Sequence, residues 1–131
     1  MNFLGLEIGG TKLQIVLGDS SAKILQRKRF SVDSKKGGAG IRQQIENALS
    51  EWLSETKISS IGIGFGGPVD WKTGKICCSH QIEGWSDFDL GNWLREKTDL
   101  PVAVDNDANV ATFGEAIHGA GVGFNPVFYV T

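Results

Sequence analysis

The sequence is poor in cysteine and in long apolar runs, and neither sign of charge dominates it. Only two cysteines occur among its 131 residues, and they are neighbours, Cys77 and Cys78. Adjacent cysteines argue against a disulfide framework or a four-ligand zinc site within the chain, and they fit a reducing compartment. No stretch approaches the ~20 apolar residues of a membrane span, and residues 1–6 lack a signal-peptide pattern. These absences predict a cytoplasmic protein with no membrane partner.

The overall charge argues against nucleic acid as a partner. Thirteen basic and fifteen acidic residues give a formal net charge of −2, whereas nucleic-acid-binding domains are typically basic. Apolar residues make up 40% and charged residues 21% of the chain, as in ordinary soluble domains. No linker, repeat or low-complexity tract divides the sequence, so we expect one domain. The unusual feature is the number of glycines, which is 18.

The amino-terminal third predicts three strands in hairpin succession. Alternating apolar residues indicate strands over 3–8, 13–17 and 23–32, joined by glycine and aspartate-serine turns. The third contains the basic run Gln26–Arg29. We interpret this run as the charged edge of a sheet rather than as a binding patch, because charge protects an edge strand from pairing with other chains.

The rest of the chain alternates predicted helices and strands. Residues 35–40 are predicted to be a flexible segment. The elements after it are a helix over 41–53, a strand over 58–65, a short helix capped by Asp87 or Asp89, a strand over 102–104, a helix ending at 119–121, and a strand over 126–131. This order predicts an α/β fold with a mixed sheet that opens with three antiparallel strands and has helices on both faces. Ligands of such sheets bind beyond the carboxyl ends of the central strands.

The predicted strand over 58–65 has a bare face. Its isoleucines and Phe65 share one face, whereas Gly62 and Gly64 leave the other without side chains, so we expect another group to approach it closely. Residues 62–67 also match the dinucleotide-binding pattern Gly-x-Gly-x-x-Gly. That pattern must open a helix, and here Pro68 begins a turn, so we reject a dinucleotide site.

The first candidate site is the segment Glu7–Lys12, at the junction of the first two predicted strands. Its paired glycines allow a tight turn whose N–H groups can face an anion, and Thr11 and Lys12 add a hydroxyl and a cation. Glu7 offers a carboxylate, which Mg²⁺ accepts directly or through water. The spacing is not that of a P-loop. An ordinary glycine hairpin with a surface lysine is the alternative interpretation.

The second candidate site is Asp105-Asn106-Asp107, where a buried strand is predicted to meet a helix. A carboxylate there stands on rigid elements and suits a general base, and the asparagine can donate to and accept from a polyhydroxyl ligand. The alternative is that Asn106 or Asp107 only caps the helix. His80 and Gln81 follow the glycine turn, close enough in sequence to border the same cleft.

Three segments together resemble motifs of the ROK family, which comprises sugar kinases and repressors of the actin and hexokinase fold. Residues 4–12 resemble its first phosphate motif, 66–70 its glycine-proline turn and 104–109 its catalytic segment. The resemblance covers nearly the whole chain and implies a ribonuclease H-like, actin-like ATPase lobe. It also implies that residues 1–131 are the amino-terminal lobe of a two-lobed, ATP-dependent sugar kinase, with the second lobe absent from this chain.

The resemblance implies roles for individual residues. Asp107 is the base that accepts a proton from a sugar hydroxyl attacking the γ-phosphate of ATP. Glu7, which stands in place of the family's usual aspartate as in fructokinase-like members, holds Mg²⁺ directly or through water. The implied sugar ligands are Gly67, Asn106, His80 and Gln81. The implied ligands of the ATP phosphates are Gly5, Gly9, Gly10, Thr11 and Lys12.

The implied reaction is phosphorylation of a hexose or an amino sugar, as in glucokinases and fructokinases. The family's second phosphate motif, adenosine site and zinc-binding cysteine cluster lie beyond Thr131, so we expect the chain alone to be inactive and to hold no zinc. The alternatives are a non-catalytic sugar-binding protein and a sugar-responsive transcriptional regulator, in which a helix-turn-helix precedes this lobe. The start of the chain almost directly on the first strand, and the presence of Glu7 and Asp107, favour the kinase. The identity of the sugar and homodimer formation stay open.

Overall fold

A computed structural model describes all 131 residues, which form a mixed five-stranded sheet flanked by helices. The strand order is β3-β2-β1-β4-β7. The strands are β1 (Asn2–Ile8), β2 (Lys12–Asp19), β3 (Ile24–Ser31), β4 (Ser60–Phe65) and β7 (Val102–Asn106). The pairs β1–β2 and β2–β3 are antiparallel, whereas β1–β4 and β4–β7 are parallel. The predicted antiparallel opening of a mixed sheet is confirmed.

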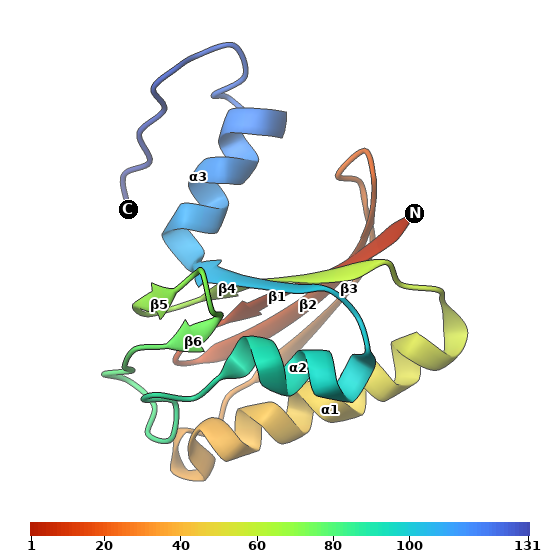
Figure 1. Ribbon diagram of the computed structural model, residues 1–131, viewed down its shortest axis with the longest axis vertical. Helices are drawn as coiled ribbons and strands as arrows, with labels where there is room; N and C mark the ends of the chain where they lie inside the picture. Colours follow the sequence, from red (N-terminus) through yellow and green to blue (C-terminus); the bar gives the residue numbers. More distant parts are fainter.

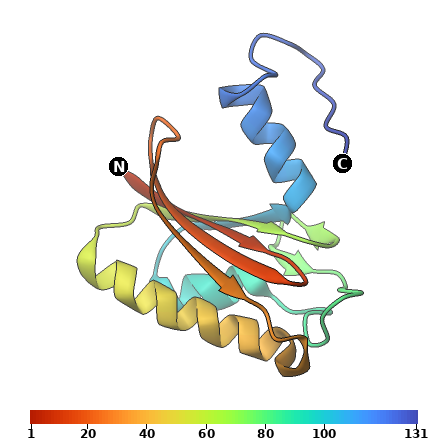
Figure 2. The same ribbon diagram turned by 180° about the vertical axis from the view of Figure 1, so that it is seen from behind.

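Helices lie on both faces of this sheet, as predicted. Helices α1 (Gly37–Glu55) and α2 (Leu90–Thr98) cover one face, and α3 (Asp107–His118) rises from the other at the end of β7 (Figures 1 and 2). The short elements are the 3₁₀ turn Ser34–Lys36 and the hairpin of β5 (Val69–Asp70) with β6 (Lys75–Ile76). No helix has both the length and the apolar character needed to cross a membrane.

The hydrophobic core lies between the sheet and α1 and α2. Alternate residues of each strand project into it, as the period of two requires, and α1 contributes the predicted stripe. The buried set includes Leu4, Leu6, Ile8, Leu13, Ile15, Leu17, Ile41, Ile45, Trp52, Ile61, Ile63, Phe65, Leu90 and Leu94. The opposite face of the sheet has small residues in the central row Val16, Gly5, Gly62 and Ala103, which are paired across the strands. One face of the sheet is therefore packed and the other is largely open.

Two sequence predictions are wrong. Residues 35–40 are not a flexible segment, because α1 already begins at Gly37. The Gly38 N–H donates to the Glu83 carbonyl oxygen at 2.8 Å, and a β-carbon at Gly38 would lie 3.0 Å from the Gly84 carbonyl oxygen. Glycine thus lets a distant loop dock on the first turn of the helix. Residues 126–131 form no strand, because they run beside α3 and pair with no strand of the sheet (Figure 1).

Candidate active site

The turn between β1 and β2 presents free backbone N–H groups. It is closed by a hydrogen bond from the Gly9 N–H to the Lys12 carbonyl oxygen at 3.0 Å. The N–H groups of Gly10 and Thr11 donate to no atom of the chain. Unpaired N–H groups at a glycine turn can donate to an anion. The turn therefore leaves two donors available, and phosphate binding there stays a prediction.

The carboxylate of Asp107 lies next to this turn. Asp107 is the first residue of α3, directly after β7, so rigid elements fix its backbone on both sides. A β-carbon built on Gly66, in the turn after β4, would lie 3.6 Å from both Asp107 Oδ2 and Gly9 Cα. The parallel strands β1, β4 and β7 end at the same edge of the sheet, which brings the three segments together. Asp107 and the glycine turn thus approach Gly66 from two sides.

Asn106 anchors the start of α3. Its side-chain oxygen accepts from the Ala108 N–H at 3.0 Å, which makes it the N-cap of the helix. Its amide nitrogen donates to the Gly67 carbonyl oxygen at 3.0 Å and lies 3.5 Å from the Phe65 carbonyl oxygen. Asn106 thus caps α3, and the Asp107 carboxylate also accepts from the Ala108 N–H, at 2.8 Å. One lone pair of the Asn106 side-chain oxygen stays free for a ligand.

Gly67 is enclosed by neighbouring groups. A β-carbon there would lie 3.1 Å from both the Cys78 carbonyl oxygen and the Phe65 ring. Any side chain would therefore displace the turn after β4. This turn continues into the β5–β6 hairpin and not into a helix. The absence of a helix after residues 62–67 agrees with the prediction that they are not a dinucleotide-binding motif.

The loop 79–82 packs against the phosphate turn. The side-chain amide of Gln81 occupies the space that a β-carbon at Gly10 would take. The remaining gap, about 10 Å³ between Gly9, Gly10, Ser79 and Gln81, is too small for a ligand. His80 is exposed, and its Nε2 lies 3.8 Å from Cys78 Sγ. The structure therefore brings Gln81 to the turn and leaves His80 on the surface of the loop.

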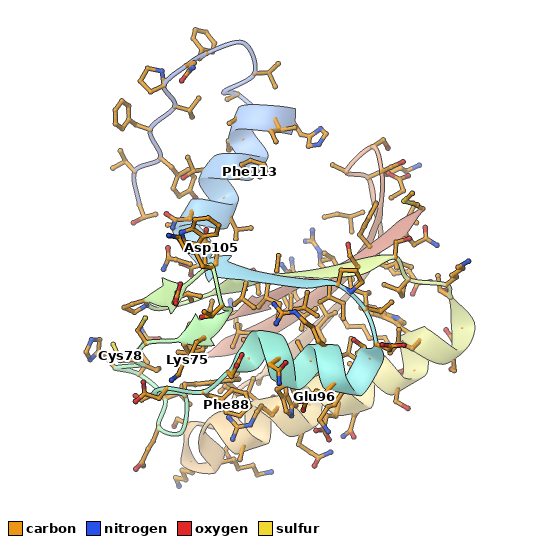
Figure 3. The ribbon with its side chains drawn as sticks, viewed as in Figure 1. Lys75, Cys78, Phe88, Glu96, Asp105 and Phe113 are labelled. Carbon is orange, nitrogen blue, oxygen red and sulfur yellow. The ribbon has the colours of Figure 1, made fainter.

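Glu7 lies in a polar row across the open face of the sheet. Glu7 pairs with Gly64 and Gly64 with Asp105, so the two acidic residues stand on one face with their backbones about 10 Å apart. Both line a cleft of about 440 Å³, and Figure 3 shows Asp105 at the base of α3. No group of three His, Cys, Asp or Glu side chains gathers anywhere in the chain. Because Mg²⁺ commonly binds through one or two carboxylates plus water and substrate phosphates, Glu7 fits such an ion.

Two glycines of the site differ from expectation. Gly5 lies in the middle of β1, four residues and about 13 Å before Gly9. The structure therefore does not bring it to the phosphate turn. The close approach expected over the bare face of β4 holds for Gly64, where a β-carbon would lie 3.3 Å from Asp107 Cα. It does not hold for Gly62, which has nothing within 4 Å.

Two polar residues near the site, Gln14 and Arg29, were given no role in it by the sequence. Gln14 donates to Glu7 at 3.1 Å, Arg29 donates to Gln14 at 2.9 Å, and Asp105 accepts from Asn109 at 3.0 Å. Within each strand, the period of two predicts which side chains share a face. Only the pairing of β1 with β2 and of β2 with β3 shows that Gln14 and Arg29 lie on the same face as Glu7 and next to it.

Comparisons with known proteins agree with this geometry. A family model described as "ROK family" matches residues 3–131. A glucokinase of Halalkalibacterium halodurans is 37% identical over 98% of the chain. The structure of a ROK family glucokinase from Streptomyces griseus in complex with glucose and AMPPNP matches 94% of the chain, with a TM-score of 0.83 and 31% identity. The chain spans about 40% of the first relative and 38% of the second.

A transcriptional regulator also shares the fold. It is a ROK family regulator, a homolog of the E. coli MLC protein, and it matches 92% of the chain and 32% of its own length at a TM-score of 0.77. At 23% identity this likeness concerns the fold alone. The family model covers nearly every residue, and the fold is the actin-like ATPase lobe of ROK kinases. The chain therefore belongs to the ROK family.

Proposed function

We propose that this chain is the amino-terminal lobe, residues 1–131, of a two-lobed kinase that phosphorylates a hexose or an amino sugar with ATP. One observation carries the proposal: Asp107 Oδ2 and the glycine turn meet at Gly66, within 3.6 Å of a common point. A base and a phosphate cradle must be this close for a hydroxyl to attack a bound phosphate. The kinase names of the relatives support the same reaction.

Asp107 is the general base of the proposed reaction. It accepts the proton of a sugar hydroxyl while that oxygen bonds to the γ-phosphorus and the bond to the β-phosphate oxygen breaks, releasing ADP. The free N–H groups of Gly10 and Thr11 and the Lys12 ammonium hold the phosphates, together with Gly9. A magnesium ion, when bound, offsets charge on the phosphate oxygens, and Glu7 holds it directly or through water.

The sugar binds next to Asn106, Gly67 and the loop 79–82. The amide hydrogens of Asn106 point to the Phe65 and Gly67 carbonyl oxygens, so they are not available to the sugar. The side-chain oxygen therefore accepts a hydrogen bond from one sugar hydroxyl through its remaining lone pair. Gln81, which packs against Gly10, and the exposed His80 contact the sugar from this loop.

The second lobe supplies what this chain lacks. The adenosine site, the second phosphate loop and any zinc-binding cysteines belong to it, and the chain alone binds sugar only weakly. We infer that the complete protein works in the cytoplasm on small-molecule substrates, with neither nucleic acid nor membrane as a partner.

Replacing the base tests the proposed function. In the complete protein, Asp107→Asn is expected to lower kcat for sugar-dependent ADP production by about 10²-fold to 10⁴-fold, with little change in sugar affinity. Asp70→Asn is the matched control, because Asp70 only organises the β5–β6 turn through Thr73 and Lys72. Normal turnover by Asp107→Asn would refute the base. Sugar binding without ADP production by the unsubstituted protein would instead indicate a regulator or a non-catalytic binding protein.

A further inference from the structure

The loop with the candidate sugar contacts docks on the first turns of α1 (Figures 1 and 2). Two hydrogen bonds join this segment, residues 79–85, to distant parts of the chain, and α1 donates both. The Gly38 N–H donates to the Glu83 carbonyl oxygen at 2.8 Å. Arg42 Nη1 donates to the Gly84 carbonyl oxygen at 3.1 Å. The other hydrogen bonds of the segment join residues at most three positions apart, so α1 supplies all of its long-range hydrogen bonds.

Arg42 also contacts two aromatic rings. Its guanidinium carbon lies 5.1 Å from the centre of the Trp85 ring and 4.2 Å from the centre of the Phe88 ring. A guanidinium is attracted to aromatic rings at such distances. No carboxylate lies within 4.0 Å of the Arg42 nitrogens. The charge of Arg42 is therefore directed at one carbonyl oxygen and two rings of the docked segment and its continuation, and it forms no ion pair.

Trp85 connects Arg42 to the candidate sugar site. Its side chain is only 1% exposed, and its ring packs edge-on against Phe65 with the ring centres 5.3 Å apart. The Phe65 ring in turn lies 3.1 Å from the point that a β-carbon at Gly67 would occupy. In the same segment, the Gln81 side chain packs against Gly10. A shift of Trp85 would therefore change the surroundings of Gly67 and the position of Gln81.

We propose that Arg42 is a positioning residue of the sugar site, which holds residues 79–85 where Gln81 lies against Gly10 and Trp85 supports Phe65. Arginine suits this task because its planar guanidinium can lie over aromatic rings and still donate to a carbonyl oxygen. A lysine ammonium keeps the charge without the plane. The inference rests on the proposed function, since it concerns the sugar side of the same site.

Glucose binding to the complete protein, measured by calorimetry, tests the role of Arg42. Arg42→Gln removes the charge and the guanidinium plane, so it is expected to weaken glucose binding by about 10-fold. At saturating glucose, kcat and the KM for ATP should change by less than about 3-fold. The reason is that the phosphate turn is closed by its own hydrogen bond and Asp107 is fixed by β7 and α3. Arg42→Lys keeps the charge near the rings and should weaken glucose binding less.

Lys28→Gln is the matched control. The Lys28 ammonium also lies over an aromatic ring of α1, 5.2 Å from the centre of the Trp52 ring, and it lies 2.6 Å from the Glu51 carboxylate. Trp52 is ten positions after Arg42 on the same helix. Lys28→Gln therefore removes a comparable contact without touching the docked segment, and it should change glucose affinity by less than about 2-fold.

Hydrogen exchange at the Gly38 amide measures the docking independently of catalysis. Gly38 is in the first turn of α1, where N–H groups have no partner within the helix. Its protection from exchange therefore depends on the Glu83 carbonyl oxygen. In Arg42→Gln this exchange should become about 10-fold faster or more, because the segment opens locally more often. In Lys28→Gln it should not change.

Unchanged exchange at Gly38 in Arg42→Gln would overturn the proposal, because the arginine would then not hold the segment. Faster exchange with unchanged glucose affinity would also overturn it, since the segment would then lie outside the sugar site. An equal loss of glucose affinity in Lys28→Gln would reduce the effect to general destabilisation. ADP production by the unsubstituted protein is a separate measurement. If glucose binds and no ADP forms, the kinase proposal fails, while the affinities still decide the role of Arg42.

Discussion

Asn106 shows how one side chain organises the candidate site. It caps α3 through the Ala108 N–H and ties β7 to the turn after β4 through the Gly67 carbonyl oxygen. These two contacts fix the backbone immediately before Asp107. Loss of Asn106 should therefore affect both the stability of the lobe and the position of the proposed base.

Substitutions of Asn106 can separate its two contacts. Asn106→Ala removes both and is expected to lower the free energy of unfolding by about 1–3 kcal/mol. Asn106→Ser keeps an oxygen that can cap α3 but cannot reach Gly67, so it should lose about half as much. Urea unfolding followed by circular dichroism measures the difference. If Asn106→Ala is as stable as the unsubstituted chain, the hydrogen bonds to Ala108 and Gly67 contribute nothing to the free energy of unfolding.

At the scale of elements, β4 determines how closely α3 approaches the sheet. Gly62 and Gly64 lie on the same face of this strand, but only Gly64 lies under the first turn of α3, next to Asp107 and Val110. A side chain at Gly64 would push that turn away from the sheet. At Gly62 it would enter open space.

The same substitution at the two glycines of β4 should have opposite effects on stability. Gly62→Ala is expected to stabilise the chain by about 0.5–1 kcal/mol, because alanine loses less conformational entropy on folding. Gly64→Ala is expected to destabilise it by about 1–3 kcal/mol, because its methyl group would lie 3.3 Å from Asp107 Cα and the first turn of α3 would have to shift. Thermal unfolding of both variants gives the comparison. If both substitutions changed the stability equally, α3 could shift without a cost in free energy, and Gly64 would not position Asp107.

For the whole molecule, the proposed reaction needs two lobes. The chain holds the candidate base, the phosphate turn and the loop 79–82, yet it spans about 40% of the length of its glucokinase relative. Several apolar side chains on and after α3 are exposed, among them Phe113 (Figure 3), Phe124 and Phe128.

The isolated chain is therefore expected to show no sugar-dependent ADP production in a coupled assay, whereas the complete protein turns over. The assay needs a folded chain, which circular dichroism verifies. Turnover by the isolated chain at the rate of the complete protein would contradict the two-lobed proposal, because one lobe would then hold the entire ATP site.

The sequence alone determined the order of most elements and the location of both candidate segments. Apolar periodicity predicted the strands and the buried stripe of α1, because these patterns depend on local geometry. The helix start at Gly37 could not be predicted, since it depends on the docking of the loop at Glu83. Whether residues 126–131 pair with a sheet likewise depends on tertiary contacts, which the local apolar pattern does not encode.

Tertiary structure alone decided which residues meet. The sequence placed Asp107 and Gly9 98 positions apart, and only the parallel arrangement of β1, β4 and β7 brings them to one edge of the sheet. Likewise, the sequence predicts that the basic run of β3 is the charged edge of a sheet, and only the pairing register places Arg27 and Arg29 on the open face and Lys28 on the packed face. Secondary-structure propensity depends on residues that are close in the sequence. The candidate site consists of residues that are far apart in the sequence and come together only when the strands pair.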